Sequence, residues 1–162
     1  RCVFGFRPHP CITAIMCNSK RFILNQINIH NMKKEIIKIK EIIAPKSPFN
    51  HVVKAGNFIF LSSQLSADLK THKILGGNIR EQTKQALENI KFLLESAGSS
   101  MDNIVKVVIY MKDVKKDFNA MNEVYRKYFK SGEEPARVTI QALSPIDKID
   151  IEIEATAIIL EE

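Results

Sequence analysis

An arginine and a carboxylate, fifteen residues apart, offer the best-placed chemistry in this 162-residue chain. Arg137 follows a proline and an alanine at the start of one strand-like run, and Glu152 lies in the next. A guanidinium binds a carboxylate through two parallel hydrogen bonds, and a carboxylate can carry a proton to or from water. The pair therefore predicts a small hydrolytic site for an acidic substrate. Residue type alone leaves two other interpretations open: a surface arginine and a solvated acidic strand face.

Other candidate groups lack the patterns that their chemistry needs. Gly76-Gly77 has no following lysine and hydroxyl residue of a phosphate loop, and Ser62-Ser63 has no nucleophile-elbow glycines. His51 and His72 are isolated in the sequence and are expected at the surface. All three cysteines precede residue 18 and do not have zinc-site spacing, so we expect neither a metal nor a cysteine nucleophile in the folded part.

The charge separates an N-terminal extension from the rest of the chain. Residues 1–31 hold four basic residues and no acid, whereas residues 32–162 hold 20 basic and 18 acidic residues. The net charge of +6 therefore gives little support to nucleic-acid binding by residues 32–162. No apolar run approaches the ~18 residues of a membrane span, so no membrane partner is expected.

The extension, residues 1–31, resembles a targeting leader for a mitochondrion or plastid in its basic, acid-free composition. The alternative is an untranslated leader with Met32 as the true start, which would leave a cytoplasmic protein. In either case, residues 32–162 are expected to form one domain.

The spacing of apolar residues predicts eight elements in that domain. A strand is expected over 35–43, then a hairpin of 49–54 and 58–63. A helix capped by Asn78 is expected over 79–97, a strand buried on both faces over 104–111, and a helix capped by Asp117 that continues to 130. Two strands follow, over 137–143 and 149–160.

This order, β-β-β-α-β-α-β-β, predicts an α+β fold with two helices on one face of a mixed sheet. Two helices cannot cover both faces of such a sheet. We therefore expect the second face to be covered by self-association.

Several motifs together resemble one family. The strongest are Pro135-Ala136-Arg137-Val138-Thr139-Ile140 and Ile151-Glu152-Ile153-Glu154-Ala155. Weaker matches, in the same order along residues 36–160, include Ser47-Pro48-Phe49, Gly56-Asn57, Ser62-Ser63-Gln64 and Glu81-Gln82-Thr83. Together they resemble the RidA family of enamine and imine deaminases, also called the YjgF or liver perchloric-acid-soluble protein family.

This resemblance implies a chorismate-mutase-like fold that assembles as a homotrimer with its sites in clefts between subunits. It implies hydrolysis of reactive 2-imino or enamine acids, such as 2-iminobutanoate and 2-iminopropanoate, to 2-oxo acids and ammonia. No metal or organic cofactor is implied.

Carried onto this sequence, the resemblance makes Arg137 and Glu152 catalytic. Arg137 would bind the substrate carboxylate, and Glu152 would handle the water and the leaving nitrogen. Thr139 and Ser62 would line the substrate site. Two further lining positions depart from the family, since Phe49 replaces a common tyrosine and Ser63 a common glycine.

Two other functions stay open at this point. Members of this family have also been labelled endoribonucleases or translation inhibitors, so an RNA-directed role is one alternative. The other is a non-catalytic binder of small 2-oxo acids, because Phe49 and Ser63 alter the expected site.

Overall fold

The computed structural model describes residues 33–160, so the predicted extension, 1–31, lies outside the described residues. The elements are β1 Lys34–Ile36, β2 Val52–Ala55, β3 Phe58–Leu61, α2 Ile79–Ser96, β4 Ile104–Met111, α3 Val114–Tyr125, β5 Ala136–Gln141 and β6 Ile151–Ile158. Short 3-10 turns, Met101–Asn103 and Arg126–Tyr128, precede β4 and follow α3. The predicted element order and the α+β class are confirmed.

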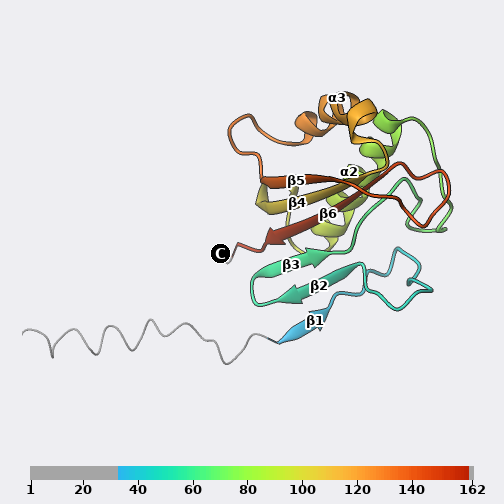
Figure 1. The fold of residues 1–162 in the computed structure, drawn as a ribbon. Helices are drawn as coiled ribbons and strands as arrows, with labels where there is room; N and C mark the ends of the chain where they lie inside the picture. The colour runs from blue at the N-terminus through green and yellow to red at the C-terminus, as the bar shows by residue number, and fades with distance from the viewer. Residues whose placement is uncertain (1–32, 161–162) are drawn as a thin grey trace, which may run out of the picture. The chain divides into compact units, whose positions relative to one another are not determined.

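The six strands form one mixed sheet in the order β1-β2-β3-β6-β4-β5 (Figure 1). Only β4 and β5 run parallel, while the other neighbours are antiparallel. The last strand, β6, therefore lies between β3 and β4. This arrangement brings segments far apart in sequence, around residues 63, 110 and 152, to one part of the sheet.

Local sequence signals fix the turns and the first helix. The β2–β3 hairpin closes through Gly56, whose φ of 57° is the left-handed conformation that glycine tolerates best. Asn78 accepts hydrogen bonds from the backbone amides of Arg80 and Glu81, while the Glu81 side chain accepts one from the Asn78 amide. This reciprocal capping box satisfies amides that a helix start otherwise leaves unpaired.

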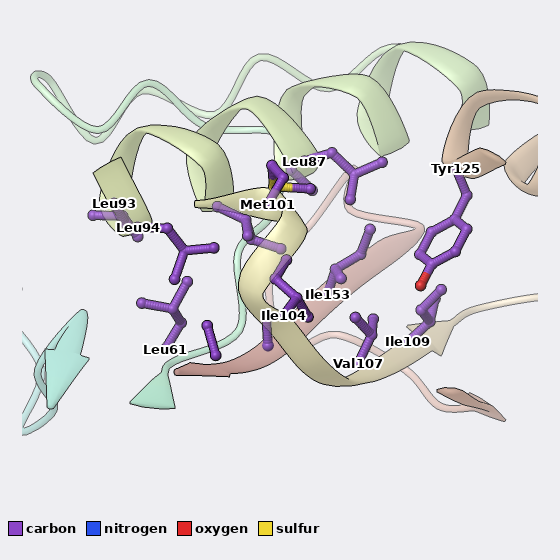
Figure 2. Close-up of a cluster of buried hydrophobic side chains, with 14 of the residues drawn as sticks. Leu61, Leu87, Leu93, Leu94, Met101, Ile104, Val107, Ile109, Tyr125 and Ile153 are labelled. Atoms are coloured by element: carbon purple, nitrogen blue, oxygen red, sulfur yellow. The ribbon is translucent and has the colours of Figure 1, made fainter. Parts of the chain in front are cut away.

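The hydrophobic core lies between α2 and one face of the sheet (Figure 2). Leu87, Leu93 and Leu94 of α2 point towards side chains of the sheet, among them Ile104 and Ile153. Along β6 every second residue is buried, from Ile151 to Ala157, as the period of a strand requires. We call this side the covered face.

Three local predictions were wrong. The strand predicted over 35–43 ends at Ile36, and its later isoleucines pack against the core from a loop. The second helix is capped by Asp113, whose carboxylate accepts from the Lys116 amide, and its α-helical part ends at Tyr125. Asp113 has the same capping chemistry as the predicted Asp117, one turn earlier.

The third error concerns β4, which was predicted to be buried on both faces. Ile104 is buried at the start of the strand, and from Val107 on only alternate residues are buried, namely Val107, Ile109 and Met111, whereas Lys106 is exposed. The opposite side of the sheet, which we call the open face, carries exposed apolar side chains on β3 and β5. These are Phe58 and Phe60 of β3 and Val138 and Ile140 of β5, each 39–44% exposed.

Candidate functional site

Glu152 lines a cleft on the open face of the sheet. Glu152 is the second residue of β6 and pairs in register with Tyr110 of β4, so both side chains leave the sheet on the same side. The cleft has a volume of about 310 Å³ and is completed by Ser63 and the loop of residues 142–145. One wall therefore comes from strands and one from a loop, and a small molecule has access to the carboxylate.

A serine hydroxyl holds the Glu152 carboxylate. Ser63 Oγ donates a hydrogen bond of 2.7 Å to Glu152 Oε2. Each carboxylate oxygen accepts hydrogen bonds separately, so this bond leaves Oε1 available for a water or a substrate. Position 63, predicted to alter the site, thus contacts the predicted proton carrier directly.

The neighbouring Tyr110 keeps its hydroxyl proton. Burial raises the pKa of Tyr110, and so does the carboxylate of Glu154, to which the hydroxyl donates at 3.3 Å. A neutral phenol beside two carboxylates adds no further negative charge to the cleft. Sequence reasoning missed Tyr110, although its period-two spacing from Lys106 and Val108 places it on the open face.

Arg137 occupies a different environment, near the start of the edge strand β5. Its Nη1 donates a 2.7 Å hydrogen bond to Asn122 Oδ1, and its guanidinium carbon lies 4.7 Å from the centre of the Tyr125 ring. A second cleft of about 430 Å³, formed with residues of α3 and the loop before β5, opens beside it. Asn122 and Tyr125 therefore fix the direction of the guanidinium.

The groups that hold Arg137 are uncharged. Burial raises the pKa of Tyr125 to about 12, and Arg137 opposes this shift because a cation favours the tyrosinate. Tyr125 is therefore a neutral ring at physiological pH. Among residues 33–160, Arg137 has no ion pair with a carboxylate. Its positive charge is positioned but not neutralised, as binding of an acidic ligand requires.

Within one protomer, Arg137 and Glu152 lie on opposite faces of the sheet. Arg137 pairs with the buried Val107 and so leaves β5 on the covered side, whereas Glu152 pairs with Tyr110 on the open side. The whole of β4 separates them, roughly 10 Å across the sheet at a strand spacing of about 4.8 Å. A single protomer therefore does not bring both side chains to one small ligand.

The other predicted lining residues, Thr139, Ser62 and Phe49, are not among the residues that line either cleft. Thr139 is half-buried on β5 and faces the same side as Arg137. Ser62 follows β3, and its carbonyl oxygen accepts a hydrogen bond of 3.0 Å from the Gln64 side chain. Phe49 is 46% exposed and packs edge-on against His51, with ring centres 5.3 Å apart.

The described residues show neither a metal cluster nor a membrane helix. Between residues 33 and 160, no three or more His, Cys, Asp or Glu side chains are grouped to hold a metal ion. No helix in that range has the length and apolarity to cross a bilayer. The chemistry available at the two clefts is therefore that of a guanidinium, carboxylates and hydroxyls.

The sequence and the fold have clear counterparts among known proteins. Residues 39–159 match the family model described as Endoribonuclease L-PSP. A RutC family protein of Pyrococcus horikoshii is 44% identical over 124 residues, which cover 76% of this chain and 97% of that protein. The human 2-iminobutanoate/2-iminopropanoate deaminase is 37% identical over 111 residues, 68% of this chain and 80% of the human protein.

Solved structures show the same similarity. The crystal structure of RidA from an Antarctic Psychrobacter is 30% identical, with a TM-score of 0.69 over 77% of this chain and 99% of that one. The fold thus defines a Rid-type α+β protein. The chain belongs to the Endoribonuclease L-PSP family, in which the RidA and RutC proteins are found.

Proposed function

We propose that this protein hydrolyses 2-imino acids and their enamine tautomers, such as 2-iminobutanoate and 2-iminopropanoate, to 2-oxo acids and ammonia. The observation that carries the proposal is that one chain presents both an oriented Arg137, which has no ion pair among residues 33–160, and a cleft-facing Glu152, on opposite faces of its sheet. A relative 37% identical to this chain bears the name of that activity.

The reaction needs few groups, because an iminium carbon is already electrophilic. Arg137 binds the substrate carboxylate in two hydrogen bonds and so orients C2. Glu152 removes a proton from a water as its oxygen bonds to C2, which gives a carbinolamine. The same carboxyl group gives that proton to nitrogen. The hydroxyl proton of the carbinolamine then passes to Glu152 as its oxygen forms the C=O bond, the C–N bond breaks, and ammonia leaves the 2-oxo acid. Ser63 keeps Glu152 Oε2 occupied, so Oε1 carries the proton.

We place each complete site between subunits of a homotrimer. Two observations support this arrangement: the opposite orientations of Arg137 and Glu152, and the exposed apolar side chains of the open face. Contiguous exposed apolar surface is typical of interfaces between subunits. Packing the open face of one protomer against the β5 edge of another brings the two residues together.

An imine-release assay tests the activity. A threonine or serine dehydratase generates the imine in the cuvette, and 2-oxo acid formation is followed with and without this protein. Wild type should accelerate formation, whereas Arg137→Ala and Glu152→Gln should each reduce the accelerated rate by about 10²-fold or more. No acceleration by wild type would rule out the deaminase.

The same preparations separate the alternatives. RNA cleavage that persists in both variants and through repeated purification would favour the RNA-directed role. Saturable binding of a 2-oxo acid without any acceleration would favour the non-catalytic binder. Circular dichroism of both variants checks that lost activity does not reflect lost folding.

A further inference from the structure

A further cavity, distinct from the clefts beside Glu152 and Arg137, adjoins the Glu152 cleft. It has a volume of about 230 Å³ and lies between the loop preceding β2 and the segment of residues 64–74. Apolar side chains form much of its lining, among them those of Phe49, Leu65, Leu69, Ile74 and Ile146. The reaction proposed above uses none of these residues.

Ser63 lines both the Glu152 cleft and the neighbouring cavity. Its hydroxyl donates a hydrogen bond of 2.7 Å to Glu152. The loop of residues 142–146 also borders both, through its first residues on one side and Ile146 on the other. The Glu152 cleft and the cavity are therefore neighbours, with Ser63 between them.

The cavity walls are held by hydrogen bonds and do not depend on a ligand. Asn89 of α2 donates to the carbonyl oxygens of Leu65 and Ala67, at 3.1 and 2.9 Å. The ring of His72 bonds the carbonyl oxygen of Ile43 at 3.0 Å, which ties the two walls together. Pre-formed apolar cavities are typical of small-molecule sites, because little order must be gained on binding.

The imidazole in the wall is uncharged. His51 and His72 were expected as isolated surface residues, but both are half-buried, with ring centres 6.4 Å apart. Burial lowers the pKa of His51, and the neighbouring His72 lowers it further. Two charged side chains line the cavity: Lys46, which is exposed, and Asp68, which directs Oδ1 to the backbone amides of Lys70 and Thr71. The interior thus suits an uncharged group.

We propose that this cavity receives the side chain of the imino acid, which makes the protein selective for 2-imino acids with large, uncharged, aromatic or branched side chains. This inference rests on the proposed function. An apolar cavity of about 150 Å³ holds a benzene-sized ring, so about 230 Å³ accommodates a phenyl group. A methyl or ethyl side chain would leave most of it empty.

Two variants test the cavity from opposite directions. Ala67 and Ile74 are bridge partners that both line it, so Ala67→Leu reduces the space and Ile74→Ala removes part of a wall. Leu75→Ala is the matched control, because Leu75 is adjacent in sequence, 50% exposed and outside the lining. An L-amino-acid oxidase generates the imines of alanine and phenylalanine, and rates without the protein are subtracted.

Wild type should hydrolyse the phenylalanine imine with a kcat/KM at least tenfold above that for the alanine imine. Ala67→Leu should lower this ratio tenfold or more, since one misplaced methylene group changes discrimination by about 10–200-fold. Ile74→Ala should lower it severalfold by loss of contacts. The alanine imine should change less than twofold in both variants, and Leu75→Ala should match wild type.

The outcomes separate this inference from the proposed function. Hydrolysis of the alanine imine without preference for the phenylalanine imine would overturn the side-chain cavity and leave the deaminase intact. The same conclusion would follow if a preference existed but neither folded variant changed it. No hydrolysis of either imine would overturn the proposed function, and the cavity assignment with it.

Discussion

The two faces of the sheet differ in how complete they are within one chain. On the covered face, Ile109 and Ile153 are fully buried beneath α2 and its neighbours. On the open face, Phe60 and Ile140 remain 43–44% exposed although they belong to the same sheet. The covered face therefore accounts for the stability of the protomer, and the open face presents surface for a partner.

The candidate site divides along the same line. Arg137 leaves the sheet on the covered side and is fixed by α3, whereas Glu152 leaves it on the open side and is fixed by Ser63. Each residue is oriented within its own protomer before any assembly. In the assembly proposed above, the two halves of the site would be pre-organised, and association would have only to bring them together.

The largest expected effect is recovery of activity by mixing two inactive variants. Arg137→Ala and Glu152→Ala should each lose about 10²-fold or more in kcat/KM. In a trimer whose sites take one residue from each of two neighbours, every trimer that contains both variants has one intact site, so the tandem-purified mixture should regain about one third of the sites. Co-expression with two different tags, tandem purification and the imine assay would measure the recovery.

The double variant, Arg137→Ala with Glu152→Ala on one chain, is the control for this experiment. Mixed with wild type, it should restore nothing beyond the sites that wild-type neighbours form. If the tandem-purified mixture of single variants stays at the activity of its parents, both residues act from the same protomer, and the division of the site between faces is wrong.

The next effect separates stability from assembly. Ile153→Ala on the covered face should lower the free energy of unfolding by about 3 kcal/mol, because it leaves a cavity in packed surroundings. Ile140→Asp on the open face should leave a folded chain of smaller oligomeric size. Urea unfolding at two protein concentrations and light scattering after gel filtration would measure the two properties.

Each substitution should change one of the two properties, stability or oligomeric size, and leave the other unchanged. Ile153→Ala should keep the wild-type oligomeric size wherever it remains folded, and Ile140→Asp should keep the helical signal in circular dichroism. A wild-type protein that is monomeric would show that the open face is not an interface between subunits. An Ile140→Asp variant that unfolds would show that this face is needed for folding of the single chain.

Sequence predicted those parts of the fold that local chemistry determines. Asn78, Gly56 and the alternation from Ile151 to Ala157 each specify a cap, a turn or a strand face on their own, and the structure has all three. The strand expected over 35–43 failed because its period-two isoleucines pack from a loop, and alternation does not distinguish the two cases.

The site was less accessible from sequence. The residue types of Arg137 and Glu152 indicated their chemistry, but their faces depend on pairing with Val107 and Tyr110 across β4. Asn122 and the proximity of His51 to His72 arise from contacts between distant segments. No local pattern encodes such contacts, so only the fold reveals them.

The smallest expected effect concerns His51, which is half-buried beside the cavity and not in the core. It tests whether burial at this place makes the stability of the protein depend on pH. The pKa of His51 lies below its usual value of 6.5 in the folded state, mainly through burial. Below about pH 6.5 the unfolded chain therefore binds more protons at this residue than the folded chain does, and stability falls as the pH falls. Between pH 7.5 and 5.5 wild type should therefore lose more in Tm than a variant without this imidazole.

His51→Gln should lose this component of the pH dependence, because a neutral amide does not titrate. His72→Asn removes only the smaller, electrostatic cause of the lowered His51 pKa, so this variant should retain most of the pH dependence. Asparagine also tolerates the φ of 58° at position 72. Asp68, the carboxylate that lines the cavity, has its pKa lowered by hydrogen bonds to Thr71 and titrates below this range. Equal pH dependence in wild type and His51→Gln would mean that the imidazole is hydrated in the folded protein, and that the cavity beside Ser63 is open to water rather than shaped for an uncharged side chain.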